Sequence, residues 1–361
     1  MDQDSGERRR TRTLLGATAV AGALLLAAVT PSPYVVEQPG PVVDTLGEAE
    51  DDGKSVPVIS IEGAETYPTS GSLNLLTVSI LGNREQPRSW LALVPALLDP
   101  TQRIAPVDEF FPEGVTVEER DTENAVLMDS SQMQAAAAAF RALGQEVRTV
   151  LTVAGVAESG PAAGELEAGD RIVSLNGRKL ADFTELRRGV AASEDRAAVR
   201  LGIERDGEPQ ELELTPRAPR EGEEPMLGIT VAARYELPAE VDFSLTRIGG
   251  PSAGLVFALA VLDRLTPGEL LEGHTVSGTG TITDAGEVGA IGGLAQKMWA
   301  ADRAGSELFL MPLANCADLP DRRPPGLRIA PVATLDEAVQ AIEAVNAGEE
   351  PRGVERCAAA S

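Results

Sequence analysis

The alternation of apolar and polar positions separates the chain into one long uncharged run and several shorter periodic segments. The run at 13–30 (TLLGATAVAGALLLAAVT) follows arginines at positions 8, 9, 10 and 12. A stretch of about 20 apolar residues spans a bilayer, and a positively charged flank stays in the cytoplasm. The pattern therefore predicts a single-pass protein of the cell membrane, with residues 1–12 cytoplasmic and the rest extracytoplasmic. A cleaved signal peptide is the alternative, and it gives the main part of the chain the same location.

Residues 31–145 form the predicted N-terminal extracytoplasmic region, which mixes strands and helices. Branched apolar runs with turn signals between them indicate strands, and apolar positions three and four apart indicate helices. A serine at 130 or 131 is expected to cap the second helix. The predicted elements are strands at 56–61 and 73–80 and helices at 89–98 and 130–143.

The remainder divides into two folded parts, a linker and a tail. Residues 146–217 carry short branched runs and predict a compact β-rich domain. The charged, Pro- and Gly-rich segment 218–227 predicts a linker. Residues 228–347 alternate strands with helices, which predicts an α/β domain. The acidic tail 348–361 is expected to be disordered. The predicted fold class is a multidomain α+β protein with a transmembrane helix, a β-rich domain and an α/β domain.

Composition narrows the classes of partner and cofactor. The chain carries 56 acidic against 31 basic residues, a formal net charge of −25, and a surface this acidic repels phosphate backbones. Nucleic acid is therefore excluded as a main partner. One histidine and two cysteines without zinc-site spacing predict neither a metal nor a cofactor. Two interpretations of Cys316 and Cys357 stay open: a disulfide, which an oxidising compartment permits, or two free thiols.

The β-rich domain carries a recognisable motif. Residues 160–177 read GPAAGELEAGDRIVSLNG, in which Gly169 and Gly177 allow positive φ at tight turns. This run resembles a bacterial PDZ domain, a family that binds an extended peptide as an added strand at a sheet edge. A rigid spacer without a ligand is the alternative. The edge that the resemblance implies is formed by Val150, Leu151, Thr152 and Val153.

Two segments of the last domain carry candidate chemistry. In the first, Gly249-Gly-Pro-Ser-Ala-Gly254 runs straight into an apolar helix, so that Ser252 lies at the positive helix end, where backbone N–H groups suit a developing oxyanion. In the second, Lys297 shares a helix face with apolar neighbours. Burial should lower the pKa of this lysine and make it a candidate general base. Taken singly, the Ser252 pattern favours a helix cap and the Lys297 pattern favours a lysine that reaches solvent.

Together these segments closely resemble the proteolytic domain of the Lon family. The resemblance implies that Ser252 is the nucleophile, that Lys297 is the base, and that Thr279 helps to position the lysine. The oxyanion hole that it implies is formed by backbone groups of Gly250, Pro251 and Ser252.

The order of the predicted parts departs from energy-dependent Lon enzymes. No G-x-x-x-x-G-K-[ST] phosphate loop is present, and the order anchor, N-terminal region, PDZ domain and protease domain is similar to membrane-anchored PDZ/Lon-type proteases of Gram-positive bacteria. The resemblance implies an ATP-independent serine endopeptidase of the cell envelope that cuts unfolded or exposed polypeptides. A homo-oligomeric ring is conceivable by analogy alone. An inactive PDZ scaffold and a self-processing protein are the alternatives.

Overall fold

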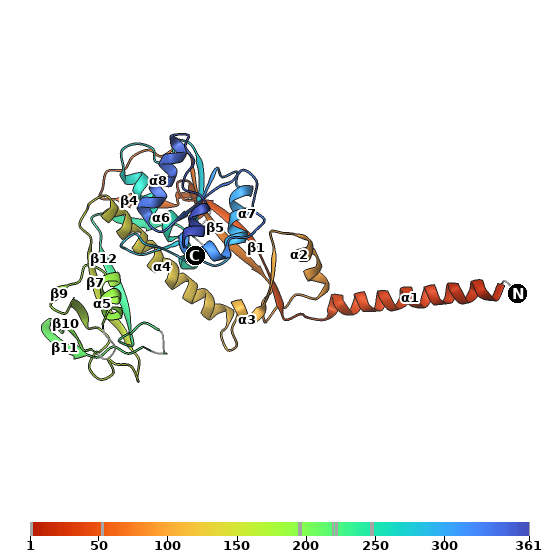
Figure 1. The fold of residues 1–361 in the computed structure, drawn as a ribbon, viewed down its shortest axis with the longest axis horizontal. Coiled ribbons are helices and arrows are strands. Elements are labelled where there is room, and N and C mark those ends of the chain that lie inside the picture. Colours follow the sequence, from red (N-terminus) through yellow and green to blue (C-terminus); the bar gives the residue numbers. More distant parts are fainter. Residues whose placement is uncertain are drawn as a thin grey trace.

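The computed structural model consists of two globular parts and a long N-terminal helix (Figure 1). It describes residues 3–51, 54–193, 197–218, 220, 223–245 and 249–360. The larger part lies between the N-terminal helix and the smaller β-rich part.

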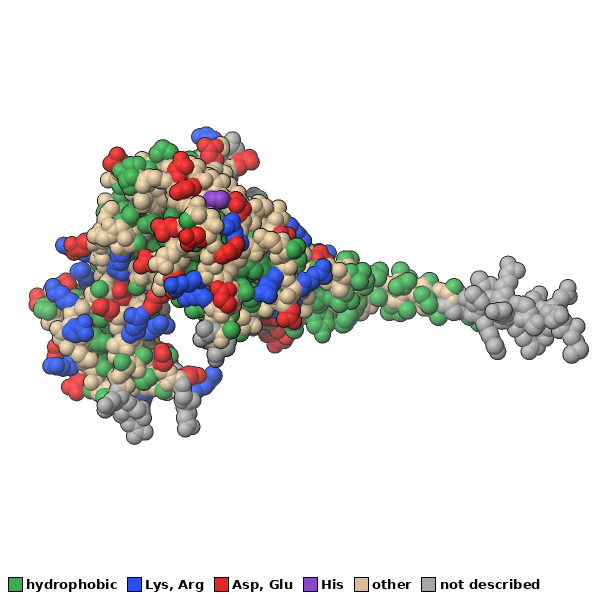
Figure 2. Space-filling view, turned by 45° about the horizontal axis from the view of Figure 1, so that its top comes forward, with side chains coloured by type: hydrophobic (Ala, Val, Ile, Leu, Met, Phe, Trp, Pro, Cys, Tyr) green, Lys and Arg blue, Asp and Glu red, His purple; other side chains and the backbone are tan. Residues whose placement is uncertain are grey.

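The N-terminal helix, α1 (Gln3–Val29), projects away from the globular parts. Figure 2 shows hydrophobic side chains along its described portion and charged side chains spread over the rest of the molecule. Within the described part of the chain, no helix is both long and apolar enough to cross a membrane. This finding contradicts the transmembrane anchor predicted at 13–30 and the single-pass localisation that followed from it.

A six-stranded sheet organises the larger part, in the order β18-β17-β14-β5-β1-β6. Its antiparallel half comes from the N-terminal region and its parallel half from the C-terminal region. The predicted boundary between residues 31–145 and 228–347 therefore does not separate two folded units, because both regions pair in one sheet. The strands are β1 (Tyr34–Asp44), β5 (Ser72–Leu81), β6 (Arg103–Pro106), β14 (Thr275–Gly278), β17 (Leu308–Pro312) and β18 (Arg328–Val332).

Helices cover both faces of this sheet. On one face α4 (Val117–Ala142), α6 (Gly254–Leu265) and α8 (Leu335–Asn346) enclose the main apolar core. On the other face α7 (Leu294–Arg303) packs with Leu294 and Met298 against the sheet. The alanines of α4 at 135–139 are buried and let α6 approach closely, as expected for small side chains.

Helix α4 begins thirteen residues before its predicted start at 130. Its cap is Thr116, whose hydroxyl accepts from the Glu119 N–H at 3.1 Å, while the Glu119 carboxylate accepts from the Thr116 N–H at 2.9 Å. Neither Ser130 nor Ser131 caps the helix. The first turns of α4 are largely exposed and charged, so they lack the apolar period on which the prediction relied.

The smaller part is a β-sheet in the order β11-β10-β8-β7-β12. Its last strand, β12 (Ile229–Glu236), pairs with β7 along its whole length. The prediction placed residues 228 onward in the last domain, whereas the structure assigns this strand to the β-rich part. The other elements of this part are β7 (Arg148–Val156), β8 (Arg171–Leu175), β9 (Arg178–Lys179), α5 (Phe183–Ala191), β10 (Val199–Arg205) and β11 (Glu208–Leu214).

The remaining elements are short and connect these units. After β12 the chain returns to the N-terminal region, where β13 pairs with β4. Their bounds are β2 (Glu48–Asp51), β3 (Lys54–Pro57), β4 (Ile59–Glu62), η1 (Leu91–Leu93), α2 (Val94–Leu98), α3 (Val107–Phe110), β13 (Glu240–Phe243), η2 (Pro251–Ala253), β15 (Thr281–Ile282), β16 (Val288–Gly289), η3 (Leu313–Asp318) and α9 (Glu355–Ala360).

Arg141 forms hydrogen bonds with residues of both globular parts. Arg141, in the last turn of α4, donates to the carboxylate of Asp284 at 3.0 Å in the larger part. On the β-rich side it donates to the Thr149 hydroxyl at 2.7 Å and to the Ala181 carbonyl at 3.2 Å. Asp284 is almost fully buried, at 3% side-chain exposure. A buried carboxylate is strongly destabilising without a partner, so Arg141 stabilises Asp284 within the larger part. Its bonds to Thr149 and Ala181 fasten the β-rich part to the same side chain.

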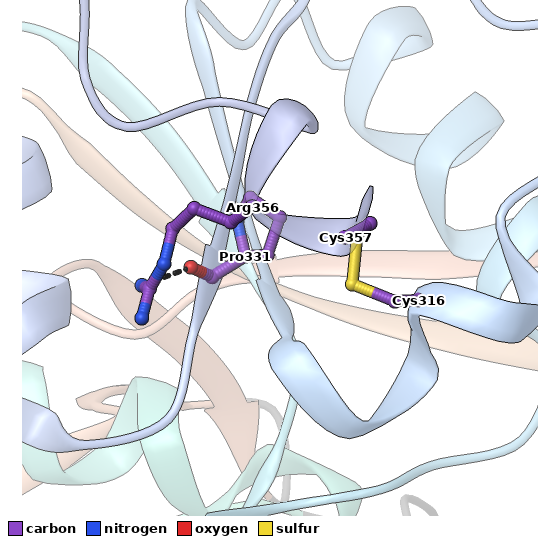
Figure 3. Close-up of a disulfide and its surroundings, with 4 residues drawn as sticks. All are labelled: Cys316, Pro331, Arg356 and Cys357. Atoms are coloured by element: carbon purple, nitrogen blue, oxygen red, sulfur yellow. Dashed lines mark hydrogen bonds between the residues drawn. A yellow bond between two sulfur atoms is a disulfide. The ribbon is translucent and has the colours of Figure 1, made fainter. Parts of the chain in front are cut away.

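The C-terminal tail is ordered, in contrast to the disorder predicted for 348–361. Arg356 donates to the Pro331 carbonyl at 2.8 Å and to both carboxylate oxygens of Glu337. The neighbouring residue in α9, Cys357, forms a disulfide with Cys316 in η3 (Figure 3). These two anchors outweigh the entropy that a charged, Gly- and Pro-bearing tail would otherwise retain.

Opening this disulfide is expected to lower the free energy of unfolding by roughly 2–4 kcal/mol. The bond closes a loop with a sequence separation of 41 residues. It therefore lowers the conformational entropy of the unfolded chain. Urea denaturation of the full chain with and without a reductant measures the difference. The variant Cys357→Ser should unfold at the reduced midpoint under both conditions, and insensitivity of the wild type to reductant would contradict the bond.

Candidate active site

Ser252 lies in a tight turn that three neighbouring elements fix. It forms the middle of η2, after Gly250 at φ +92° and directly before α6. The Ser252 carbonyl accepts from the N–H of Gly280 at 2.9 Å. On the other side, the Ser131 hydroxyl of α4 donates to the Pro251 carbonyl at 3.1 Å. The Ser252 hydroxyl is thus presented from a backbone that cannot easily shift, as a nucleophile requires.

Lys297 approaches this turn from α7. The helix begins after Gly293, a left-handed residue at φ +69°, and places the lysine one turn into the helix. The Lys297 side chain is only 2% exposed, and its Nζ lies 2.8 Å from the Ser252 Oγ. The fold brings together two side chains that are 45 residues apart in the sequence.

Thr279 completes the hydrogen-bond arrangement. Its hydroxyl oxygen lies 3.0 Å from the Lys297 Nζ, and the same hydroxyl donates to the Ser252 carbonyl at 3.1 Å. Because that donation uses the only hydroxyl proton of Thr279, the hydroxyl acts as an acceptor toward lysine. A neutral lysine amine that donates to Thr279 can turn its lone pair toward the Ser252 hydroxyl. The geometry therefore suits proton transfer from Ser252 to Lys297.

Burial makes the neutral amine accessible near physiological pH. Desolvation lowers the pKa of Lys297 from 10.5 to about 8, and the charge of Glu37 opposes this shift. At pH 7 about a tenth of the lysine is then unprotonated, far more than for a lysine in water. Such a lysine is a competent general base at neutral pH.

A cavity of about 300 Å³ opens onto these groups. It is lined by the second half of β5, by Met128 of α4 and by the turn from Gly249 to Ala253, with Lys297 and the Ser252 side chain at its wall. Its size and mixed lining are suitable for a substrate side chain beside the scissile bond.

The backbone groups implied for the oxyanion hole are only partly available. The N–H of Gly250 donates to the Asn124 carbonyl at 3.0 Å, and Pro251 has no N–H. Of the three predicted residues, this leaves the N–H of Ser252 as a donor. The preceding residues 246–248 lie outside the described part of the chain.

The predicted peptide groove is not a free edge. Val150, Leu151, Thr152 and Val153 belong to β7, which pairs with β12 along this stretch and with β8 at Leu151 and Thr152. A central strand has no unpaired backbone groups for an added peptide. The prediction failed because β12 follows the linker and reads in sequence as part of the next domain. On the side of β7, the sheet ends at β12 instead.

His274, the single histidine, lies apart from the dyad. It precedes β14, and its Nδ1 lies 3.0 Å from the carboxylate of Glu307. Thr279 follows the opposite end of the same strand. Among the residues that the structure describes, no cluster of His, Cys, Asp and Glu side chains could hold a metal ion.

Glu37 is a site residue that sequence reasoning missed. It lies on β1 with 2% side-chain exposure and pairs with Arg103 at 2.6 Å. The available signal was a charged residue within the apolar run YVVEQPG, which is unusual for a buried strand. Glu37 lies near α7 only because β1 joins the central sheet, and β1 is far from α7 in the sequence.

Comparison with known families agrees with this geometry. Residues 245–344 match the model of the Lon protease (S16) C-terminal proteolytic domain. Residues 245–344 form a Lon-type proteolytic domain. Lon-type domains are serine peptidases, and Ser252 and Lys297 both lie within the matched part. Residues 114–215 match the model of the PDZ domain, a match that ends before β12.

Individual relatives agree with the Lon-type domain. The chain is 34% identical over 114 residues to a Lon protease of Campylobacter concisus, covering 30% of this chain and 14% of the relative. It is 39% identical over 113 residues to Lon protease 1 of Myxococcus xanthus, again covering 30% of this chain and 14% of the relative. The chain thus spans only about a seventh of the length of these curated relatives.

Solved structures are also similar to a part of this chain. The PDZ domain of an SdrC-like protein from Listeria monocytogenes is 22% identical, with a TM-score of 0.22, and covers 23% of this chain and 86% of its own. A solution structure from Geobacillus thermodenitrificans is 32% identical, with a TM-score of 0.20, and covers 22% of this chain and 92% of its own.

Proposed function

We propose that this chain is an ATP-independent serine endopeptidase that cuts unfolded or exposed polypeptide segments with Ser252 and Lys297. The observation that carries the proposal is the 2.8 Å contact between the buried Lys297 Nζ and the Ser252 Oγ at a cavity wall. In the first step, the amine takes the Ser252 proton while Oγ attacks the substrate carbonyl carbon. The same proton then passes to the leaving amine as the peptide bond breaks, and water later releases the acyl group.

The sequence supports the energy independence that we propose. Its 361 residues contain no phosphate-loop motif that would couple ATP hydrolysis to unfolding. The substrate chain must be extended around the scissile bond to enter a site formed by β5 and the turn at Ser252. Substrates are therefore expected to be flexible tails, exposed loops and misfolded chains.

The β-rich part is proposed to bind an extended peptide at β12. This strand ends the sheet, and it begins after Gly228 at φ +72°, where the backbone turns sharply. An extended ligand would continue the sheet by pairing with the outer backbone groups of β12, the usual mode of strand addition. Polypeptides are thus expected both as substrates and as ligands.

Cleavage of casein by the full chain, without ATP or magnesium, tests the proposal. Wild type and Ser130→Ala should produce fragments, whereas Ser252→Ala should produce none. Ser130 is a matched control because it is an exposed serine of α4. ATP should leave the rate unchanged.

Each other result has a definite meaning. Cleavage by Ser252→Ala would exclude Ser252 as the nucleophile. A strict need for ATP would overturn energy independence. A wild type that leaves casein intact would favour a scaffold, and a smaller mass for wild type than for Ser252→Ala would reveal self-processing.

A further inference from the structure

Glu37 is a buried carboxylate on β1, a strand that contacts α7, the helix that carries Lys297. One of its oxygens, Oε2, accepts from the Arg103 Nε at 2.6 Å. Arg103 is 44% exposed and also binds Glu109 on its outer side. Glu37 and Arg103 face each other across the β1–β6 pairing, so the strands hold the ion pair in place. Only one side of the carboxylate is thereby satisfied.

The other oxygen of Glu37 faces the start of α7. A Cβ placed on Gly293 would lie only 2.8 Å from the Glu37 Oε1, so the carboxylate closely adjoins this residue. Gly293 also accepts from the Lys297 N–H at 3.0 Å through its carbonyl, which closes the first turn of the helix. A negative charge at the N-terminus of a helix is stabilised by the helix dipole. Glu37 therefore acts on the same turn that carries Lys297.

Among the described residues, no other charged group on the elements that contact α7 faces the first turn of this helix. Strands β5 and β17, which also contact α7, contain no titratable residue. The remaining groups on elements that contact α7 are directed elsewhere: Asp44 accepts from the Leu46 and Leu73 N–H groups, Asp318 from the Asn315 amide, and Arg303 donates to the Thr101 hydroxyl. Tyr34 lies at the start of β1, edge-on to Trp90, and Asp302 in the last turn of α7 is exposed.

We propose that Glu37 is a positioning residue for the reaction, whose buried carboxylate sets the charge state and the place of the Lys297 amine. This inference rests on the proposed function of the Ser252–Lys297 pair. Desolvation alone would drive the amine to a lower pKa, and the Glu37 charge raises that pKa again. Arg103 limits this effect, because its positive charge neutralises part of the carboxylate. The pair Glu37–Arg103 thus adjusts the base from outside the substrate cavity.

The two members of the pair should act in opposite directions. Replacing Glu37 by glutamine removes a negative charge and leaves Arg103 paired with Glu109 alone, so the pKa of Lys297 should fall by about one unit. Replacing Arg103 by glutamine leaves the carboxylate without its counter-charge, so the pKa of Lys297 should rise. A purely structural ion pair would change stability in both variants without moving this pKa in either.

Direct titration of the lysine tests the inference without depending on cleavage. The chain contains three lysines, Lys54, Lys179 and Lys297, so lysine labelled with ¹³C at Cε gives few signals in the full chain. The titration midpoint of Lys297 is measured in a Ser252→Ala background, alone and combined with Glu37→Gln, Arg103→Gln or Glu109→Gln. Glu109→Gln is the matched control, since it removes a carboxylate bound to the outer side of Arg103.

The expected order of midpoints is Glu37→Gln lowest, the parent and Glu109→Gln equal, and Arg103→Gln highest. Identical midpoints in the folded variants would overturn the inference. If Glu37→Gln does not fold, the rise expected for Arg103→Gln still decides the matter, and its absence would overturn the inference. Failure of the wild type to cleave casein would instead overturn the proposed function, whatever the titration shows.

Discussion

Replacing Lys297 by methionine is expected to reduce turnover by on the order of 10⁴-fold while the fold is retained. Methionine fills the buried space with a flexible apolar chain, so packing around α7 should survive. The amine that lies 2.8 Å from the Ser252 Oγ is lost, and no other base lies against this hydroxyl among the described contacts. The hydroxyl alone is a weak nucleophile at neutral pH.

Initial rates on a fluorogenic casein measure this effect. Lys179→Met is the matched control, because Lys179 is an exposed lysine of β9 and its loss should leave the rate unchanged. The double variant Ser252→Ala with Lys297→Met should be no slower than either single variant, since the two groups act as one unit. Additive losses would contradict a dyad.

The same lysine sets the pH dependence of the wild type. Only the neutral amine accepts the proton, so kcat/KM should rise with pH and level off above the Lys297 pKa of about 8. Below that value the rate should fall tenfold per unit, because the protonated fraction grows in that proportion. A profile governed by a group near pH 6 would point to another base.

Replacing Arg141 by methionine is expected to lower the free energy of unfolding by roughly 3–5 kcal/mol. The side chain of Asp284 is 3% exposed, and Arg141 is the cation that pairs with it at 3.0 Å. Burial already raises the pKa of Asp284, and Arg141 opposes that rise. Without the arginine, a buried carboxylate stays unpaired beside the contact between the two globular parts.

Urea denaturation of the full chain measures the loss, and a second substitution identifies its cause. Adding Asp284→Asn to Arg141→Met should restore much of the stability, because the unpaired charge is removed. Arg148→Met is the control, since Arg148 is 75% exposed and its ion pairs contribute little. An equal loss in the single and double variants would assign the effect to packing.

The penalty for losing Arg141 should also depend on pH. The folded-state pKa of Asp284 then lies further above its unfolded value, so the unfolded state releases the proton more readily as the pH rises. The loss of stability is therefore full at neutral pH and disappears below the unfolded pKa of about 3.9. Comparing pH 7 with pH 4.5 should show a smaller difference between wild type and variant at the lower pH.

Local sequence determined the chemistry of this protein more fully than its architecture. Ser252 at the start of an apolar helix and Lys297 on an apolar helix face are patterns that the chain expresses within a few residues. The pairing of β10 with β11 also follows from two short strands and the tight turn between them at Asp206 and Gly207. Such features depend on residues that are close in the sequence, and a periodic pattern of apolar residues reveals them.

Tertiary structure alone decided which distant segments share a sheet. Strands β1, β5 and β6 precede the β-rich part, yet they pair with β14 in the Lon-type domain. Strand β12 likewise follows the linker and returns to β7. An apolar strand has the same pattern beside any partner, so sequence predicted the strands and misplaced the domain boundaries and the peptide groove.

The surroundings of the catalytic lysine show the same division. The sequence indicated that Lys297 would be buried, because its helix neighbours are apolar. The family resemblance implied that Thr279 lies beside the lysine, but nothing in the sequence indicated that Glu37 and its partner Arg103 lie near α7, since they are on two separate strands. The base was therefore predictable as a residue, whereas its pKa depends on desolvation and on a charge that only the folded chain places beside it.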